Sequence, residues 1–331
     1  HGALTVERNF MLLAPILFFG GKGGVGKTTL ATATALRLAQ EGKDVLLVST
    51  DPAHNLGHIW DAALSDVPTT VRPHLSVVEL DPARATEEHL GDVGKQMRRF
   101  MPERLHREVD RHLDLARQSP GTHEAAMLER IAELIEDRAD YDHIVFDTAP
   151  SGHTSRLMAL PEIMAAYTDG LLARREKSDK FGAVVRGMTS AEKSVSTLSM
   201  DPVDRRNQEI RSTLLTRRRR FERLQTALTS ASTTTFYLVL TADRTPVLET
   251  AEFFEELTAN GVHVGGLVVN RRTPDSQDAF LAQRRASEDE ALALLAQALP
   301  GQPIVEIPWL PHEVSTPEAL TALADSLPQS L

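Results

Sequence analysis

The sequence has no cysteine, few aromatic residues and no long apolar run. Without thiols the chain can form no disulfide, thiolate zinc site, iron–sulfur cluster or cysteine nucleophile. No apolar run reaches the roughly 18 residues that a membrane-spanning helix requires. A chain without cysteine fits a reducing compartment, so we expect a cytoplasmic protein with no transmembrane segment of its own.

An excess of positive charge is also missing. The chain has 36 Lys and Arg residues against 46 Asp and Glu residues, which gives a formal net charge of −10. This acidic balance argues against a general nucleic-acid binder, and we expect no nucleic-acid partner. At 331 residues the chain can bury a substantial core, as one large domain or as a core with insertions.

The most specific motif that is present is a phosphate-binding loop. The spacing GxxxxGK[ST] runs from Gly21 to Thr28, after an apolar run and before a stretch compatible with a helix. We expect Lys27 to reach the β- and γ-phosphates of a nucleotide and the Thr28 hydroxyl to coordinate Mg²⁺. Lys22 is an additional lysine with no role in the ordinary loop. The residues predicted to bind nucleotide here are Gly21, Gly23, Gly24, Val25, Gly26, Lys27, Thr28 and Thr29.

Two aspartates follow apolar runs farther along the chain. Asp147 ends the run Ile144–Phe146, an arrangement that holds a carboxylate at Mg²⁺ in P-loop enzymes. Asp51 follows the run 45–48, at the end of a predicted strand where parallel sheets bind ligands. Asp51 polarises an attacking water, contacts the Mg²⁺ shell or only caps a turn, and the pattern leaves these three roles open.

Short apolar runs such as 45–48, 144–146, 236–240 and 267–269 alternate with helical stretches along most of the chain, which favours an α/β fold with a mostly parallel sheet covered on both faces. Two longer helical stretches interrupt this rhythm and predict a helical subdomain. Their apolar residues recur at helical spacing: Leu105, Val109 and Leu113 in the first stretch, and Ile210, Leu214, Phe221, Leu224 and Leu228 in the second. We read the charged segment 173–202 between them as a mobile connection and a possible lid. The predicted division is 12–83, 141–160 and 231–331 for the core, with 84–140 and 161–230 as helical insertions.

Four segments together resemble one family. GGKGGVGKTT, STDPAHNL, DTAPSGHTSRL and TPVLETAEF are similar to segments of the arsenical-pump ATPases and the tail-anchored-protein targeting ATPases, over about residues 15–311. That family belongs to the deviant-Walker class of P-loop NTPases. The resemblance implies a Mg²⁺-dependent ATPase whose cofactors are ATP and Mg²⁺, and which switches with nucleotide as a homodimer.

The resemblance also implies roles for residues around the phosphates. Lys22 matches a lysine that reaches across the dimer interface to the partner's nucleotide. Asp51 matches the first-switch carboxylate that positions the attacking water. Asp147 matches the second switch, in the core segment 141–160, and holds Mg²⁺ together with Thr28.

A second set of matches concerns the nucleoside. Asn270 matches an asparagine that contacts adenine. Pro308, Trp309 and Pro311 fall where a proline-containing loop of segment 231–331 covers the base. Asp243 stands where the targeting branch tends to have a glutamate near the nucleotide, so its assignment rests on a departure from the pattern.

The resemblance leaves two processes open for coupling to the ATPase. In one, the helical subdomain handles a hydrophobic membrane-protein segment, as in tail-anchored-protein targeting. In the other, the chain is an arsenite- or anion-transporting subunit that energises a membrane exporter. The absence of cysteine removes the soft ligands that trivalent arsenic prefers, although TPVLET reads more like the pump branch. Related positioning ATPases, which polymerise on DNA or membranes, would be expected to have a basic surface or a basic C-terminus. They are disfavoured, because the C-terminal TPEALTALADSLPQSL has no basic residue.

The helical insertions supply candidate client or partner contacts. The run Arg217–Arg220 forms a solvated face or, less plainly, a contact with a partner or an anionic membrane. Histidines such as His54 and His58 are more often polar helix or switch residues than metal ligands. Apolar residues of the second insertion either line a client groove or pack the subdomain: Ile163, Met164, Tyr167, Leu171, Leu172, Phe181, Val184, Val185 and Met188.

Overall fold

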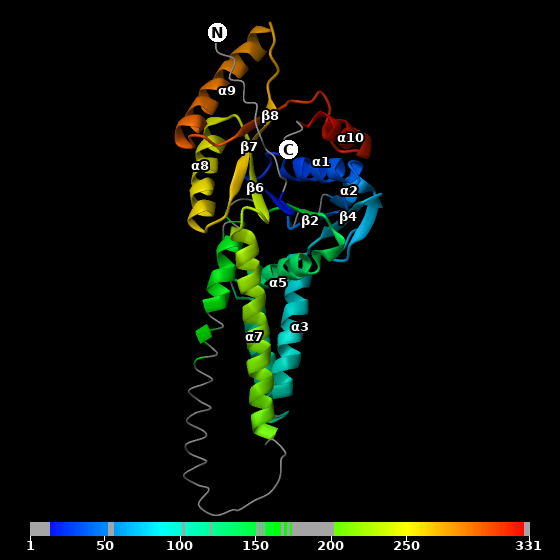
Figure 1. Ribbon diagram of the computed structural model, residues 1–331, viewed down its shortest axis with the longest axis vertical. Coiled ribbons are helices and arrows are strands. Elements are labelled where there is room, and N and C mark those ends of the chain that lie inside the picture. Colours follow the sequence, from blue (N-terminus) through cyan, green and yellow to red (C-terminus); the bar gives the residue numbers. More distant parts are fainter. Residues whose placement is uncertain are drawn as a thin grey trace, which may run out of the picture.

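The computed structural model shows a body built on one sheet and a long helical arm that projects from it (Figure 1). It describes residues 14–51, 56–100, 103–119, 121–149, 152, 154, 156–166, 169, 170, 173 and 202–327. The predicted mobile connection 173–202 lies almost entirely outside the described residues. So do most residues of the proposed client groove.

Eight strands of the described chain form one sheet in the order β3-β4-β2-β5-β1-β6-β7-β8. Every neighbouring pair is parallel except β3 and β4. The prediction of a mostly parallel α/β sheet is therefore confirmed. The strands are β1 (Ile16–Gly20), β2 (Val45–Ser49), β3 (Thr69–Arg72), β4 (Leu75–Glu79), β5 (His143–Asp147), β6 (Thr234–Thr241), β7 (Val264–Arg272) and β8 (Ile304–Pro308).

Helices cover both faces of the sheet and build the arm (Figure 1). They are α1 (Lys27–Gln40), α2 (Leu56–Trp60), α3 (Pro82–Phe100), α4 (His106–Arg117), α5 (Thr122–Glu136), α7 (Pro202–Thr229), α8 (Arg244–Ala259), α9 (Ala279–Ala298) and α10 (Pro317–Ser326), with 3₁₀ turns at Glu103–Leu105 and Arg138–Asp140.

The two faces of the sheet carry separate apolar cores. Phe18 and Phe19 are adjacent in β1, and because strand side chains alternate they point into opposite cores. Phe18 stacks between Phe146 and Phe236, at ring-centroid distances of 4.5 and 5.1 Å, under α5, α7, α8 and α9. Phe19 belongs to the core under α1 and α10. Burial on both faces explains why these strands read as continuous apolar runs.

Strand β3 is a feature that the sequence pattern did not indicate. It pairs with β4 in an antiparallel hairpin at the sheet edge. Its side chains alternate between exposed and half-buried, and the Arg72 guanidinium lies 5.3 Å from the centre of the Trp60 ring. A four-residue edge strand with two threonines offers too little apolar sequence to be recognised.

The arm consists of helices from both predicted insertions. Val109 and Leu113 of α4 pack on Leu90 of α3 in a small apolar cluster, whereas Leu105 of the same predicted stripe is exposed. At the base of the arm, the α7 residues Phe221, Leu224 and Leu228 are buried in the main core, as their spacing predicted. Helix α5 likewise joins that core, so the insertions are packed onto the sheet at their base.

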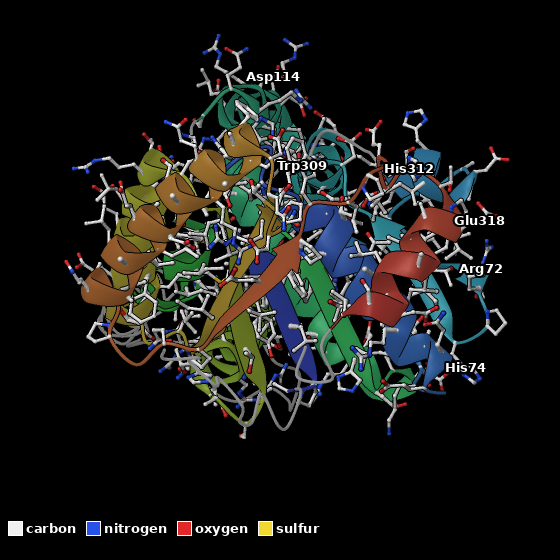
Figure 2. All side chains as sticks on the ribbon, turned by 90° about the horizontal axis from the view of Figure 1, so that it is seen from above. Arg72, His74, Asp114, Trp309, His312 and Glu318 are labelled. Atoms are coloured by element: carbon white, nitrogen blue, oxygen red, sulfur yellow. The ribbon has the colours of Figure 1, made fainter. Side chains whose placement is uncertain are left out.

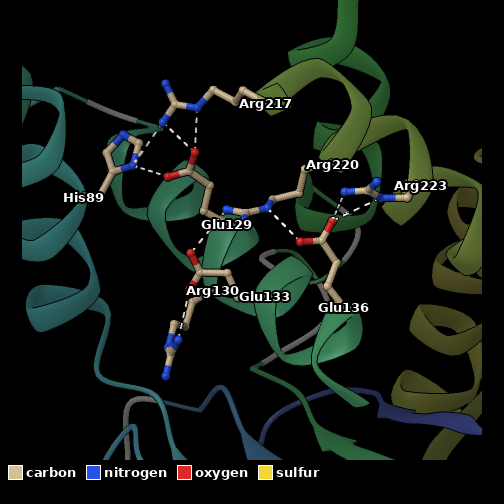
Figure 3. A network of polar contacts seen from close by, with 8 residues as sticks. All are labelled: His89, Glu129, Arg130, Glu133, Glu136, Arg217, Arg220 and Arg223. Atoms are coloured by element: carbon tan, nitrogen blue, oxygen red, sulfur yellow. Dashed lines mark hydrogen bonds and ion pairs between the residues drawn. The ribbon is translucent and has the colours of Figure 1, made fainter. Parts of the chain in front are cut away.

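The run Arg217–Arg220 is not the uniformly solvated face that we favoured. Arg217 donates to Glu129 of α5 at 2.5 Å, and Arg220 donates to Glu136 at 3.0 Å and to Glu133 at 3.2 Å. Figure 3 shows these arginines on α7 reaching carboxylates on α5, with His89 of α3 beside Glu129. Arg219 is the exposed member of the run. The physical reason is that α7 turns this face toward α5, so the arginines become inter-helix partners.

Candidate functional site

The phosphate-binding loop connects β1 to α1 at the carboxyl edge of the sheet. Gly21, Gly24 and Gly26 have φ angles of 146°, 80° and 96°. A Cβ on Gly21 would lie 2.2 Å from the carbonyl oxygen of Val239, and one on Gly26 would lie 2.3 Å from Nδ2 of Asn270. The loop therefore needs glycine both for its backbone conformation and for its close contacts. Its position before the α1 N-terminus suits a phosphate group.

The two lysines of this loop occupy different environments. The Lys27 side chain is buried, and its Nζ donates to the carbonyl oxygen of Lys22 at 3.0 Å. Burial lowers the pKa of Lys27, while the charges of Asp147 and Asp51 oppose this shift. The Lys22 side chain is half exposed, and its Nζ forms an ion pair with Oε1 of Glu249 at 2.6 Å. Only Lys27 is thus fixed inside the loop.

Asp147 and Thr28 meet beneath the loop, although 119 positions separate them in the sequence. The Thr28 hydroxyl donates to Oδ2 of Asp147 at 2.7 Å, and the Ser49 hydroxyl lies 3.4 Å from the same oxygen. Burial raises the pKa of Asp147 to about 7, although the Thr28 hydrogen bond and the Lys27 charge act in the opposite direction.

These two residues fit a Mg²⁺ ion. The second carboxylate oxygen of Asp147, Oδ1, is buried and has no hydrogen-bond partner. An ionised carboxylate in such a place requires a compensating cation, and hard oxygen ligands from a carboxylate and a hydroxyl are those that Mg²⁺ accepts. The described residues contain no group of three or more His, Asp or Glu side chains that could hold a metal by themselves. The histidines thus supply no separate metal centre in that part of the chain.

Asp51 lies at the end of β2, next to this group. It is partly buried, and its backbone N–H donates to the Ser49 hydroxyl at 3.3 Å. The charge of its carboxylate acts to raise the pKa of Lys27, against the larger lowering by burial. The rest of the predicted first switch, residues 52–55 with His54, falls outside the described residues. The structure thus brings Asp51, Lys27 and Asp147 to one place.

A cavity of about 570 Å³ opens beside the loop and has a size that suits a nucleotide-sized ligand. Trp309 and Phe280 are both largely exposed and contribute to its wall. Figure 2 shows Trp309 between the start of α9 and α1. The lining consists of Lys22, Gly23, Gly24, Val25, Thr241, Ala242, Asp243, Thr245, Pro246, Arg271, Thr273, Phe280, Leu281, Arg284, Glu288 and Trp309.

Of the predicted base-binding residues, Asp243 and Trp309 line this cavity, whereas Asn270, Pro308 and Pro311 do not. Asn270 Nδ2 donates to the carbonyl oxygen of Val25 at 2.8 Å, which ties the end of β7 to the phosphate loop. Asp243 lines the cavity and pairs with Arg284 at 2.8 Å. Pro308 ends β8 and Pro311 follows it, both with exposed side chains and neither in the cavity wall.

A buried ion network supports this end of the sheet, and the sequence pattern did not reveal it. Arg272 and Glu288 are each 3% exposed and pair at 2.6 Å. Arg272 also pairs with Asp289 and Glu306, and Thr273 donates twice to Glu288. The backbone N–H of Trp309 donates to the carbonyl oxygen of Arg272 at 2.8 Å. The network therefore fixes the ends of β7 and β8, from which Asn270 and Trp309 extend.

Glu249 and Phe280 were also missed. Glu249 lies within the quoted segment TPVLET, but nothing in the spacing connects it to a lysine 227 positions away. Phe280 follows the α9 N-cap Asp278, and an isolated aromatic near a helix start is not a site signal.

Comparison with known proteins gives a consistent family. Residues 14–329 match the sequence profile of the anion-transporting ATPase family. A putative arsenical pump-driving ATPase 2 of Aquifex aeolicus is 30% identical over 315 residues, which cover 95% of this chain and 99% of that protein. An arsenical pump-driving ATPase of Escherichia coli is 31% identical over 96% of this chain but only 50% of its own length. ATPase get3 of Schizosaccharomyces japonicus is 28% identical over 94% and 91%.

The lengths of these relatives differ. This chain spans nearly all of the Aquifex relative but about half the length of several curated pump-driving relatives. Among the described residues, no helix has the length and apolar character needed to cross a membrane. The phosphate loop, the Thr28–Asp147 pair and the match across residues 14–329 agree, and the chain belongs to the anion-transporting ATPase family of P-loop ATPases.

Proposed function

We propose that this protein hydrolyses ATP with Mg²⁺ and switches between nucleotide-dependent states as a homodimer. The observation that carries the proposal is the buried pair of Thr28 and Asp147 beneath the phosphate loop, with one carboxylate oxygen left without a hydrogen-bond partner. The unpartnered carboxylate oxygen is free to coordinate a cation, whereas a purely structural Asp–Thr pair would not need one.

The side chains divide the work on the nucleotide. The loop backbone would hold the phosphate oxygens, and Lys27 would neutralise charge on the β- and γ-phosphates. Thr28 and Asp147 would hold Mg²⁺, which stabilises charge on the phosphate oxygens when bound. Asp51, which is close enough to Lys27 to affect its pKa, would orient the attacking water. Asp243 and Trp309, which line the cavity, and Asn270, which is bonded to the loop at Val25, would contact the nucleoside.

Lys22 supports the proposed dimer. Its side chain is half exposed at the cavity wall, so a second copy of the chain can approach it there. A cation delivered to phosphates in trans acts like an arginine finger, which contributes ~10³–10⁵ in rate. We expect Lys22→Ala to keep nucleotide affinity within a few fold and to lose most turnover. Turnover of this variant at the parental rate would refute the role in trans.

For the coupled process we propose handling of a hydrophobic membrane-protein segment. The absence of cysteine supports this choice over arsenite transport, because no thiolate is present to bind trivalent arsenic. In the described arm, α3, α5 and α7 face one another through ion pairs, so these helices do not supply an apolar groove between them. Ile163 is 58% exposed and Met164 packs against the core, so only Ile163 of these two fits a client surface.

The second candidate is an anion-transporting subunit that energises a membrane exporter. It is favoured by a small margin of sequence identity, which is 30–33% for the pump-driving relatives and 28–30% for the GET3-type ATPases. ATPase assays with and without arsenite, beside capture of a single-helix client on the ATP-bound protein, separate the two. Client retention with no arsenite response supports the first candidate, and arsenite stimulation without retention supports the second. We propose the cytoplasm as the compartment, which suits a cysteine-free chain.

A further inference from the structure

Lys22 is held within its own protomer by a residue that no motif assigns. Its Nζ lies 2.6 Å from Oε1 of Glu249, on α8, and the two side chains are 49% and 38% exposed. The backbone of Lys22 is held separately, because its carbonyl oxygen accepts the hydrogen bond from Lys27. The loop position of Lys22 is therefore fixed while its ammonium group is directed at α8.

Glu249 stands at the edge of the proposed nucleotide cavity. Thr245, one helical turn earlier on the same face of α8, is part of the cavity wall, as is Lys22. The other oxygen of Glu249, Oε2, is buried and has no hydrogen-bond partner. The carboxylate thus faces the site with Lys22 as a counterion, and both oxygens would carry uncompensated charge if Lys22 moved away.

The Lys22 ammonium group cannot form close ion pairs with Glu249 and with the phosphates of a second copy at the same time. A triphosphate of a second copy and the Glu249 carboxylate compete for it, and a carboxylate near phosphate oxygens adds like-charge repulsion. We propose that Glu249 is a positioning residue that retains Lys22 on its own protomer and releases it when the nucleotide-bound dimer closes. This inference rests on the proposed role of Lys22 in trans.

The exposure of the pair sets the size of the effect. Ion pairs between exposed side chains change an equilibrium by a factor of about 1.4–5, since solvent screens them. A two-fold symmetric dimer releases two such pairs, so the dimerisation constant should change by the square of that factor, about 2–25-fold. A restraint of this size delays closure but yields to the several charges of ATP.

The experiment compares Glu249→Gln with the parent, with Lys22→Ala and with the double variant K22A/E249Q. Glu255→Gln is the matched control, because Glu255 is an exposed carboxylate on the same helix. Dimerisation is measured by sedimentation with Mg²⁺ and a non-hydrolysable ATP analogue, and turnover is measured against protein concentration. Thermal unfolding of each variant verifies that the fold is retained.

We expect E249Q to dimerise about 2–25-fold more tightly and to reach half-maximal turnover at a correspondingly lower protein concentration, while E255Q matches the parent. The gain should be smaller in the K22A background, since there is then no lysine to release and only the like-charge repulsion between Glu249 and the phosphates is relieved. Equal behaviour of E249Q and E255Q, a loss of turnover in E249Q, or the same gain in the K22A background would each overturn the inference. Parental turnover in K22A would instead overturn the proposed function.

Discussion

Arg272→Met tests whether the buried ion network holds the nucleotide end of the sheet. Arg272 and Glu288 are each 3% exposed, so removing the guanidinium leaves a carboxylate enclosed in protein. Removing one partner of a buried pair costs about 3–5 kcal/mol of unfolding free energy, because the remaining charge is uncompensated. Methionine keeps much of the volume of the arginine stem, which limits any cavity contribution.

The surroundings place the expected value near the lower end of that range. Thr273 still donates two hydrogen bonds to Glu288, and Arg284 remains 3.1 Å from it. Asp289 and Glu306, the other partners of Arg272, are 61% and 42% exposed, so water can replace the guanidinium there. We therefore expect a loss of about 3 kcal/mol, almost all of it from Glu288.

Urea unfolding at pH 7 is the assay, and Arg223→Met is the matched control. Arg223 also pairs with a glutamate, Glu136, but it is 63% exposed, so its loss should cost no more than about 1 kcal/mol. In R272M/E288Q the buried charge is gone, so the double variant should recover about 0.5–3 kcal/mol relative to additivity. Nucleotide affinity should fall in R272M, because the Arg272 guanidinium ties the end of β7 to Glu306 of β8, the strand that Trp309 follows. A cost for R272M equal to that of R223M, or strict additivity in the double variant, would refute the reasoning.

Three further predictions concern the site and the arm. Asp147→Asn neutralises a buried carboxylate that has an unpartnered oxygen. It should therefore lower Mg²⁺ affinity at least ~10-fold, seen in the Mg²⁺ dependence of turnover, without lowering the melting temperature. Turnover that saturates at the same Mg²⁺ concentration as in the parent would contradict this prediction. Gly21→Ala should abolish nucleotide binding in titration calorimetry and destabilise the fold by about 1–3 kcal/mol, since its Cβ would lie 2.2 Å from the Val239 carbonyl oxygen. Gly42→Ala is the control and should bind nucleotide normally, because its Cβ would have no neighbour within 4 Å. For Glu129, burial acts to raise the pKa, but the His89 hydrogen bond and the Arg217 charge outweigh it, so the folded-state pKa lies below the ordinary value of 4.5. Its stabilisation is complete above that ordinary value and is lost as pH falls through the folded pKa. Glu129→Gln should therefore cost about 1–3 kcal/mol in urea unfolding at pH 7, and the difference from the parent should shrink below pH 4.5; a difference that is constant with pH would refute the ion pairing.

The fold was predictable where strands are buried on both faces of the sheet, because such strands have continuous apolar sequences. The runs around Phe18, Phe146 and Phe236 predicted three central strands, and these residues stack in the core. Strand β3 was not predictable, because its alternating residues TTVR are neither apolar nor long. The α7 stripe through Phe221 and Leu228 was predictable from helical spacing, whereas the partners of Arg217 and Arg220 depend on the position of α5.

The site divides in a similar way. Glycines at fixed spacing identify the loop because steric contact with Val239 and Asn270 excludes any side chain at two of them. The role of Asp147 follows from its place after a buried strand, but its unpartnered oxygen could be seen only in the packed structure. Asn270 was predicted beside the nucleoside site, and its bond to the loop carbonyl of Val25 was not.

The sequence alone determined the nucleotide-binding machinery, because a glycine loop, its lysine and a strand-end aspartate are local patterns whose chemistry depends on spacing. It also determined the alternation of strands and helices, which follows from burial. The tertiary structure decided which distant charges meet: Lys22 with Glu249, Arg272 with Glu288, and Arg217 with Glu129. Such pairs join elements from 16 to 227 positions apart, and no local spacing encodes them. They exist because the sheet order brings α8 beside the phosphate loop, α9 beside the end of β7, and α7 beside α5.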